Sequence, residues 1–469
     1  MTVRVRGAGS LDPAMAAIAI VLGLAGALSA QETPRLANLG PVVLYENAHL
    51  IPGDGSAAIE SSAFLVRDGR IAAVGKKGEV RAPTGTPRVD LAGKTVIPTF
   101  TNAHTHVGFQ RGATYSRDNY GRESILEDLN RALYFGTTAV ASQGIDPGDV
   151  ALRIRAEQAA GRLGGARLFL AGRGIGAPNA GPGAAAYRGI AYEVTTLEQG
   201  RQAVREQAAL KVDLIKIWVD DRNGRAPRMT PEISHAIIDE AHKHGLKVNA
   251  HVFYLVDLQD LVNAGIDGFA HLARDLEIGD ATVQEMIRRG VVMLPTIGTP
   301  ERTTHTSVPP SMAAWLDGPV RTALPAAMID QMKLGFGGRD AATAAANRER
   351  YAILQRSVAK LARAGAKIAL GSDTGTQDNP FGVTEHRELE MMVEAGMTPM
   401  QALVAATGTA AAYLKLRDQG IIARDKRANF IVLDANPLDD ITNTRRIARV
   451  FVNGREVDRA ALAKNLSRP

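Results

Sequence analysis

The sequence predicts an α/β protein in which a (β/α)8 barrel of the TIM type is joined to a small β-sandwich domain. Two observations support this prediction. Between residues 95 and 373, eight short apolar runs alternate with helical stretches, a pattern typical of parallel strands buried between helices. At both ends of the chain, short β-branched runs broken by Gly, Asp and Pro replace this alternation.

The two terminal segments are each expected to contribute part of one β-sandwich. Residues 31–97 contain short β-branched runs, and the Asp-Gly pair of "RDGR" (68–71) predicts a hairpin between two of them. Residues 420–469 contain "NFIVLDANP" and "IARVFVNGREV", which are strands of the same kind. The barrel is therefore expected to occupy residues 98–419, between the two parts of the sandwich.

The apolar runs define the expected barrel strands. They are residues 95–106, 137–142, 166–172, 213–219, 246–252, 267–272, 291–296 and 366–373. Two stretches, 176–186 and 298–310, are predicted to be long irregular loops. Each follows an expected strand, and therefore lies on the face where barrel enzymes place their chemistry.

Helix signals separate these strands. Residues 230–245 predict a helix, because Thr230 is a favourable N-cap, Pro231 suits the first turn and Gly245 suits the end. Residues 350–365 predict another, and a helical pair follows the last expected barrel strand. This alternation of strand and helix is what a parallel barrel requires.

The composition is that of an ordinary globular protein, with 469 residues, 45% of them hydrophobic and 22% charged. The net charge is +6, but lysines and arginines are scattered and no run of them interleaves with aromatic residues. Nucleic acid is therefore not expected as a partner. The chain has no cysteine, which excludes disulfides, thiolate metal ligands and a lipid anchor on cysteine.

Residues 1–30 are expected to be an export signal. Arg4 and Arg6 supply a positive start, residues 15–28 supply an apolar segment, and small residues precede a cleavage point near Ala30. The mature protein is then periplasmic or secreted and has no stable membrane insertion. Two alternatives stay open: that Met15 rather than Met1 is the true start, and that the segment remains attached as an anchor.

Polar side chains of metal-ligating type fall on five of the expected strands, towards their carboxyl ends. They are His104, His106, Lys216, His251, His271 and Asp373. Side chains at these strand ends converge on one mouth of a barrel. The two histidines of "NAHTH" stand two residues apart and therefore point the same way from an extended strand.

Each of these residues also has an ordinary structural interpretation. The His-x-His pair alone could be a polar strand end, and His251 alone could be a hydrogen-bonded core histidine. Asp373 could cap a helix or a turn, and Lys216 could pair with a carboxylate inside the barrel. What favours metal binding is that all six residues occur at the same end of five different strands.

The chain resembles the metal-dependent hydrolases of the amidohydrolase superfamily from about residue 40 to about residue 458. The motifs that carry the resemblance are "VIPTFTNAHTHVG", "IKIWVDDRNG", "LGSDTG" and "HRELEMMVEAGMTPMQALVAATGTAAAYL", together with the two single histidines. By pattern it is similar to the prolidase-like and imidazolonepropionase-like branch. Imidazolonepropionase holds one metal and lacks the bridging lysine, so Lys216 argues against that activity.

The resemblance implies a binuclear metal centre. One ion would be held by His104, His106 and Asp373, and the other by His251 and His271, with a carboxylated Lys216 as bridge. Burial favours the neutral amine of a lysine, which can add CO2 to form an anionic carbamate with two oxygens. Such a donor set suits two divalent ions, zinc first, with manganese or cobalt as alternatives.

The activity implied is hydrolysis of an amide by attack of a metal-bridging hydroxide, with Asp373 as general acid and base. Dipeptides, N-acyl amino acids and amides of the ochratoxin type fit, and each carries a carboxylate beside the scissile bond. Side chains that could bind this carboxylate are Arg222, Tyr254, His305 and Arg173. Similar proteins are often homo-oligomers, so a homo-oligomer is expected.

Two other functions stay open. A lactonase or phosphotriesterase would use the same metal ligands, and a non-catalytic metal-binding or solute-binding protein would need no acid or base. The chain also departs from many similar proteins after the third expected strand, where "GIGAPNAGPGAAAYRG" lacks a histidine. The expected metal ligands therefore define the centre better than they define the substrate.

Overall fold

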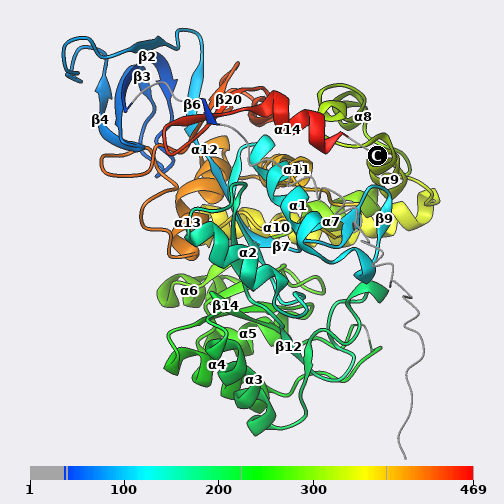
Figure 1. The fold of residues 1–469 in the computed structure, drawn as a ribbon. Coiled ribbons are helices and arrows are strands. Elements are labelled where there is room, and N and C mark those ends of the chain that lie inside the picture. Colours follow the sequence, from blue (N-terminus) through cyan, green and yellow to red (C-terminus); the bar gives the residue numbers. More distant parts are fainter. Residues whose placement is uncertain (1–35, 38–40, 223, 377, 468–469) are drawn as a thin grey trace, which may run out of the picture. The chain divides into compact units, whose positions relative to one another are not determined.

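The strands of the computed structural model divide into a parallel set in the middle of the chain, a mixed sheet built from both chain ends, and a short antiparallel pair, β8 (Gln110–Arg111) and β9 (Thr114–Tyr115) (Figure 1). The structure describes residues 36–37, 41–222, 224–376 and 378–467. The expected export signal, residues 1–30, lies outside the described residues. All described residues belong to one compact unit, Thr33–Pro469, so the boundaries expected between sandwich and barrel stay a prediction.

Each of the eight predicted runs contains a strand of the parallel set. The strands are β7 (Phe100–Thr105), β10 (Thr137–Ser142), β11 (Arg167–Leu170), β12 (Ile175–Gly176), β13 (Tyr192–Glu193), β14 (Leu214–Trp218), β15 (Lys247–His251), β16 (Gly268–Ala270), β17 (Val292–Leu294) and β18 (Lys367–Ile368). They form the orders β11-β10-β7 and β13-β12-β14-β15-β16-β17-β18, with every pair parallel.

Backbone hydrogen bonds connect the first strand of this set to the segment that follows the last. The N–H of Ala103 donates to the carbonyl of Leu370 at 2.9 Å, and the N–H of Asp373 donates to the carbonyl of His104 at 3.0 Å. β11 and β12 lie on one continuous segment and link the two sheets at the other side. These contacts bring the first and last strands together, as a TIM-type arrangement requires.

The predicted run 95–106 is two strands, which corrects the expectation of one. β6 (Thr95–Pro98) pairs with β2 and β19 of the mixed sheet, whereas β7 pairs with β10 of the parallel set. The break follows Pro98, whose nitrogen has no hydrogen to donate to a ladder. The chain therefore passes from one sheet to the other within a single apolar run.

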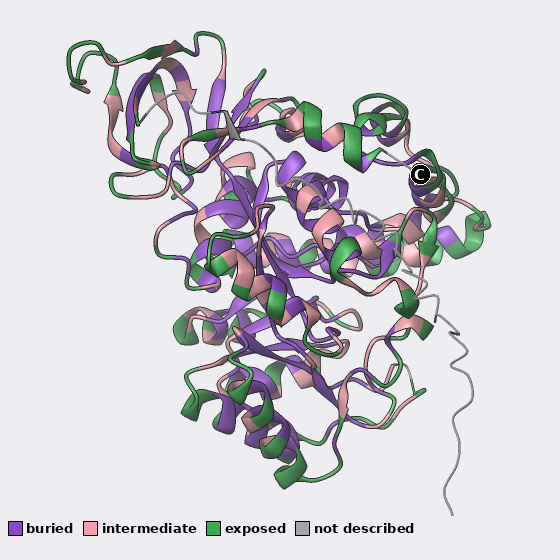
Figure 2. Ribbon diagram, in the orientation of Figure 1, coloured by how far each residue is buried: buried purple, intermediate pink, exposed green. Residues whose placement is uncertain are grey.

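Ten helices of the described chain lie before the last parallel strand, interspersed with the parallel strands, and four follow it. They are α1 (Arg122–Tyr134), α2 (Val150–Ala159), α3 (Leu197–Ala209), α4 (Pro231–Lys243), α5 (Leu255–Ala264), α6 (Asp280–Arg289), α7 (Gly298–Glu301), α8 (Pro310–Asp317), α9 (Ala326–Phe336), α10 (Ala341–Arg363), α11 (Val383–Glu394), α12 (Pro399–Val404), α13 (Ala410–Tyr413) and α14 (Arg459–Leu466). α3 packs on α4, α4 on α5 and α5 on α6. Figure 2 shows the strands in the colour of buried residues and exposed residues along the helices.

The predicted helices and loops agree with the structure in part. α4 ends at Lys243, and Gly245 follows with a φ of +67°, which suits glycine at a helix end. α10 is longer than the predicted helix 350–365. The predicted irregular loop 298–310 instead begins with α7 and a 3-10 turn over Arg302–Thr304, so its first part is helical rather than irregular.

Both ends of the chain build the mixed sheet. Its strands are β1 (Leu36–Ala37), β2 (Val42–Leu50), β3 (Ile59–Arg67), β4 (Arg70–Lys76), β5 (Arg88–Asp90), β6, β19 (Phe430–Leu433), β20 (Ile447–Val452) and β21 (Arg455–Val457). The order is β1-β21-β20-β19-β6-β2-β3-β4, with β5 beside β2. The predicted hairpin is confirmed: Asp68 and Gly69 connect β3 to β4, with φ values of +48° and +78°.

Aromatic side chains form the core of this sheet. The rings of Phe64 on β3 and Phe430 on β19 lie 5.1 Å apart, although two strands separate β3 from β19 in the sheet. In a flat sheet that separation would be about 14 Å, so the sheet curves until its inner side chains meet. Whether this curved sheet forms two layers of a sandwich stays a prediction.

None of the helices in the described part of the chain combines the length and the apolar character that a membrane span requires.

Candidate metal centre

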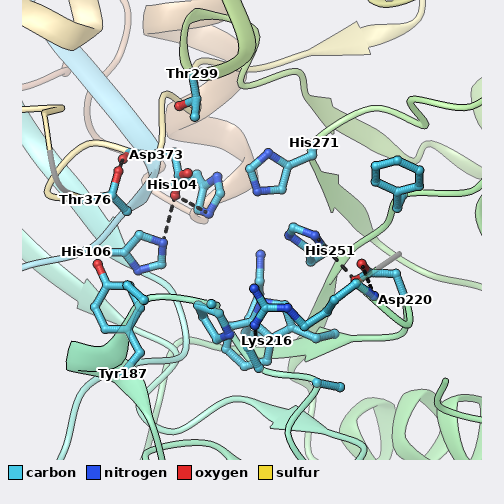
Figure 3. Close-up of a pocket in the computed structure, with 18 of the residues that line it drawn as sticks. His104, His106, Tyr187, Lys216, Asp220, His251, His271, Thr299, Asp373 and Thr376 are labelled. Carbon is cyan, nitrogen blue, oxygen red and sulfur yellow. Dashed lines mark hydrogen bonds and ion pairs between the residues drawn. The ribbon is translucent and has the colours of Figure 1, made fainter. Parts of the chain in front are cut away.

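The six predicted ligands meet in one cavity of about 440 Å³ at the carboxyl ends of the parallel strands (Figure 3). They are His104, His106, Lys216, His251, His271 and Asp373. The predicted convergence of these side chains is therefore seen in the structure, and the cavity is bounded on other sides by loops that follow β12, β14, β15, β16 and β17.

His104, His106 and Asp373 form the tightest group. The Nε2 atoms of His104 and His106 lie 3.5 and 2.9 Å from Oδ1 of Asp373, and the three ligand atoms all lie within 4.8 Å of one another. The hydrogen bond from the Asp373 N–H to the His104 carbonyl fixes the two segments in register. The alternative role of Asp373 as a simple cap does not account for this position.

The four histidines form a chain across the cavity. Ring centroids lie 5.3 Å apart for His106 and His104, 5.1 Å for His104 and His271, and 4.5 Å for His271 and His251. Burial holds the pKa of His104, His251 and His271 well below the usual range. Neutral imidazole is the form that binds a metal ion, so these rings are in the ligand state.

Asp373 is held as an anion. Burial alone would raise the pKa of its carboxyl, but His104, His106 and Lys216 outweigh that effect and lower the pKa overall. The carboxylate therefore keeps its charge inside the cavity, and a cation would be attracted to it strongly.

Lys216 is the most unusual of the six residues. Its side chain is 1% exposed, and its Nζ has no hydrogen-bond partner among the described residues. Asn249 lies opposite Lys216 on the neighbouring strand β15, and its side-chain amide donates to Gln143 at 2.6 Å. Burial lowers the pKa of Lys216 to about 7, against the weaker opposing effects of Asp373 and Asp220. The alternative that Lys216 pairs with a barrel carboxylate is therefore not what the structure shows.

Two of the predicted ligands have backbone conformations that side-chain-bearing residues seldom adopt. The φ of His271 is +81° and that of Asp373 is +57°. Each such residue costs about 1–3 kcal/mol and persists only where the surroundings enforce it. Here the N–H of His271 donates to the carbonyl of Leu294 at 3.0 Å, and Asp373 is tied to His104. Such conformations are concentrated at functional sites.

A glycine behind the centre lets the two ligand-bearing segments approach. A Cβ on Gly375, which has a φ of +90°, would lie 1.6 Å from the carbonyl oxygen of His106. We expect Gly375→Ala to lower the free energy of unfolding by about 3 kcal/mol or more, from backbone strain and overpacking together. Thermal and denaturant unfolding measure this effect.

The matched control is Gly78→Ala. Gly78 has the same φ of +90°, but a Cβ there would meet no atom within 4 Å. It should therefore show only the conformational cost, of about 1–2 kcal/mol. Equal destabilisation of the two variants would mean that the close approach at His106 has no energetic role.

The four predicted carboxylate-binding residues are placed differently. Arg222 lines the cavity and donates to the carbonyl of Gly181. Tyr254, His305 and Arg173 are not among the lining residues. The Tyr254 hydroxyl donates to Asp221 at 2.9 Å, His305 pairs with Glu301, and Nε of Arg173 donates to the carbonyl of Ile190 at 2.6 Å. Their polar atoms are thus satisfied by neighbouring protein groups outside the cavity.

Other lining residues were not predicted. They include Tyr115, Tyr187, Asp220, Arg274 and Arg302. Tyr187 comes from the stretch that lacks a histidine, and its ring centroid lies 6.0 Å from that of His106. Asp220 stands four residues after Lys216 and Arg274 three after His271, so proximity to a predicted ligand could have identified both. Tyr187 and Arg302 lie in loops that give no periodic signal.

Comparison with known proteins identifies the family. The model of the amidohydrolase family matches residues 95–457, which is most of the chain. The chain belongs to the amidohydrolase family. As an amidohydrolase it is a hydrolase, and members of this family generally use divalent metal ions. The resemblance seen in the sequence is thereby confirmed at the level of the family.

Individual relatives of this amidohydrolase are distant. Ochratoxinase of Aspergillus niger is 26% identical over 449 residues, covering 84% of this chain and 81% of the relative. Phenylurea hydrolase B has a TM-score of 0.72 at 24% identity, covering 91% of this chain and 100% of the other. A Xaa-Pro dipeptidase has a TM-score of 0.70 at 24% identity, covering 88% and 99%. These structures share the TIM-barrel-type α/β fold.

Proposed function

We propose that this amidohydrolase is a binuclear metal-dependent enzyme that cleaves the amide bond of a dipeptide, an N-acyl amino acid or an ochratoxin-type amide. The observation that carries the proposal is the buried Nζ of Lys216, without a hydrogen-bond partner among the described residues, in one cavity with four histidines and an aspartate. Such an amine has a large desolvation cost unless it is neutral or modified.

The donor set fits two divalent ions, with zinc as the first choice. His104, His106 and Asp373 would hold one ion, and His251 and His271 the other, with Lys216 between them. The imidazoles of His104, His251 and His271 are neutral and the carboxylate of Asp373 is charged, as binding requires. Imidazole with carboxylate oxygen is a ligand combination that zinc accepts.

As a carbamate, Lys216 would join the two groups of metal ligands. Its neutral Nζ attacks the carbon of CO2, an N–C bond forms as one C–O π pair moves to oxygen, and the nitrogen releases a proton. The product is an anion with two oxygens. A pKa of about 7 leaves much of the amine neutral near pH 7, so no protein base is needed to generate the free amine, and solvent water accepts the proton that the nitrogen releases. The buried cation is thereby replaced by an anion that two metal ions compensate.

Asp373 is suited to proton transfer at the amide. Two divalent ions, when bound, acidify a water molecule and polarise the amide carbonyl. The Asp373 carboxylate takes a proton from the attacking water and delivers it to the nitrogen of the leaving amine, as a general base and then a general acid. Its side chain is 14% exposed, so it faces the cavity. Trp218 and Tyr187 line the same cavity.

The relatives support an amide substrate, because ochratoxinase and prolidases act on amide bonds. The test is a hydrolysis screen of dipeptides, N-acyl amino acids and an ochratoxin-type amide, with metal analysis of the same sample. We expect amide turnover and two metal ions per chain. Efficient turnover of lactones or phosphotriesters without any amide would show that the reaction class is wrong. If a zinc-loaded sample hydrolyses no substrate of the panel, the result would favour a non-catalytic metal-binding or solute-binding protein.

Asp220 supplies a further test of the ligand assignment. Its Oδ1 lies 3.4 Å from Nε2 of His251, and at this distance the carboxylate can orient the ring. Partners of this kind typically contribute about 10- to 100-fold to metal affinity. We expect Asp220→Asn to weaken binding of one of the two ions by that factor, measured by titration against a chelator.

Asp221→Asn is the matched control for this prediction. Asp221 is adjacent in sequence, but it accepts a hydrogen bond from Tyr254 and does not line the cavity. Its replacement should leave both metal affinities unchanged. Equal affinities in wild type and Asp220→Asn would refute the proposed contact with His251.

A further inference from the structure

The cavity around the candidate metal centre carries an excess of arginine. Four guanidinium groups line it, from Arg222, Arg225, Arg274 and Arg302. Its described lining residues include two carboxylates, Asp220 and Asp373. Asp373 is already engaged by His104 and His106. The remaining positive charge is therefore not balanced by the described residues of the cavity, and bound metal ions would increase it further.

Arg274 is distinguished from the other three. It stands three residues after His271, and its N–H donates to the carbonyl of Phe253 at 2.8 Å, which anchors its backbone to the loop after β15. Its guanidinium lies 5.9 Å from the centroid of the Phe253 ring. Among the described residues it forms no ion pair and no side-chain hydrogen bond, although it can donate five.

The other arginines have protein partners or lie at the rim. Arg222 donates to the carbonyl of Gly181, and Arg302 donates to the carbonyl of Asp378 at 2.8 Å. Arg225 is exposed. Burial lowers the pKa of Arg274 more than the attraction of Asp220 and Asp373 raises it. The protein thus places a half-buried guanidinium in the cavity that holds the predicted metal ligands, and no described carboxylate forms an ion pair with it.

We propose that Arg274 binds the carboxylate of the substrate, next to the amide that is cleaved. This inference rests on the proposed function and names its substrate class: amides whose leaving amine carries a carboxylate. A guanidinium matches a carboxylate with two parallel hydrogen bonds. Because Arg274 follows His271 so closely, a carboxylate bound there lies beside the centre, as the short link between an α-carboxylate and its amide nitrogen requires.

Binding of a matched pair of small probes tests the contact without any catalysis. The probes are 3-phenylpropanoate and 3-phenylpropan-1-ol, which share a ring and chain but differ in charge. Calorimetry on the zinc-loaded full chain should show tighter binding of the acid. Arg274→Gln should weaken binding of the acid by about 10- to 100-fold, the usual effect of a charged hydrogen bond, and leave the alcohol unchanged. The affinity of Arg274→Lys for the acid should lie between those of wild type and Arg274→Gln.

Arg228→Gln is the matched control. It removes the same charge from the loop after β14, but Arg228 pairs with Asp257 and does not line the cavity. Its affinity for the acid should equal that of wild type. Unchanged affinity for the acid in Arg274→Gln, or an equal loss for acid and alcohol, would overturn the inference. Circular dichroism and metal content confirm that each variant is folded and loaded.

Kinetics separate this inference from the proposed function. N-Acetyl-L-phenylalanine and N-acetyl-L-phenylalaninamide differ only in the carboxylate, and release of acetate is measured for both. Wild type should prefer the acid, and Arg274→Gln should lower kcat/KM for the acid alone. Equal rates on the two substrates in wild type would overturn the inference and leave amide hydrolysis intact. If no amide in the broad panel is cleaved while the binding difference remains, the proposed function fails and the carboxylate site stands.

Discussion

Lys216→Ala should lose more than about 100-fold in kcat/KM and at least one of two metal ions per chain. The substitution removes the only group proposed to bridge the two sets of metal ligands. The loss should therefore exceed the roughly 10- to 100-fold fall in activity that follows when a residue hydrogen-bonded to a metal ligand is replaced. Metal analysis and amide hydrolysis on the same sample measure both effects. Retention of two ions at the full rate would refute the bridge.

Chemical rescue makes this prediction specific to the missing carbamate. Acetate or propionate added to Lys216→Ala or Lys216→Gly should restore part of the rate, because a small carboxylate supplies two oxygens where the side chain was removed. Lys247→Ala is the matched control. Lys247 lies on the neighbouring strand β15, but its Nζ donates to the carbonyl of Tyr413 at 2.8 Å and does not face the cavity. It should keep both ions and gain nothing from acetate.

Asp373→Asn is expected to lower kcat by about 10²- to 10⁴-fold, the usual contribution of a general acid and base. The amide keeps the shape of the carboxyl but neither accepts nor delivers the proton. Since Asp373 is also a proposed ligand, the measurement is made at a zinc concentration that restores the wild-type metal content. Full kcat under those conditions would exclude Asp373 from proton transfer.

Asp146→Asn is the control for loss of a buried carboxyl group. Asp146 follows β10, accepts a hydrogen bond from Ser142 at 2.7 Å and does not line the cavity. Burial raises its pKa to about 7, so its neutral form is already accessible and an amide is a mild replacement. A large fall in kcat for this variant would mean that any buried carboxyl near the strands affects the rate.

The barrel strands and the ligand positions could be predicted from the sequence because both follow short-range rules. Buried parallel strands are short apolar runs, and their carboxyl ends converge whatever the loops do. The residues at these ends, such as His104 and Asp373, therefore met as predicted. The division of residues 95–106 between two sheets was missed, because apolarity does not reveal which sheet a run joins.

The loop residues were predictable only in part, because loop conformation depends on tertiary contacts. Tyr254 and His305 follow strands 5 and 7 of the barrel, yet both turn to partners outside the cavity. Arg274 and Tyr187 turn inward instead. The positive φ of His271 also has no signature in the sequence. Local pattern thus predicted which side chains converge on the cavity, whereas the other lining residues required the structure.

The mixed sheet has a consequence for synthesis on the ribosome. Ile97 of β6 pairs with Ile431 of β19, and Leu36 of β1 pairs with Val457 of β21. At about 5–20 residues per second, β6 waits on the order of tens of seconds for its partner to be translated. During that interval the edge of β6 that later faces β19 is open, and an unpaired edge invites association with other chains. Nascent chains stalled before β19 should therefore aggregate, or depend on a chaperone, more than the released full-length protein.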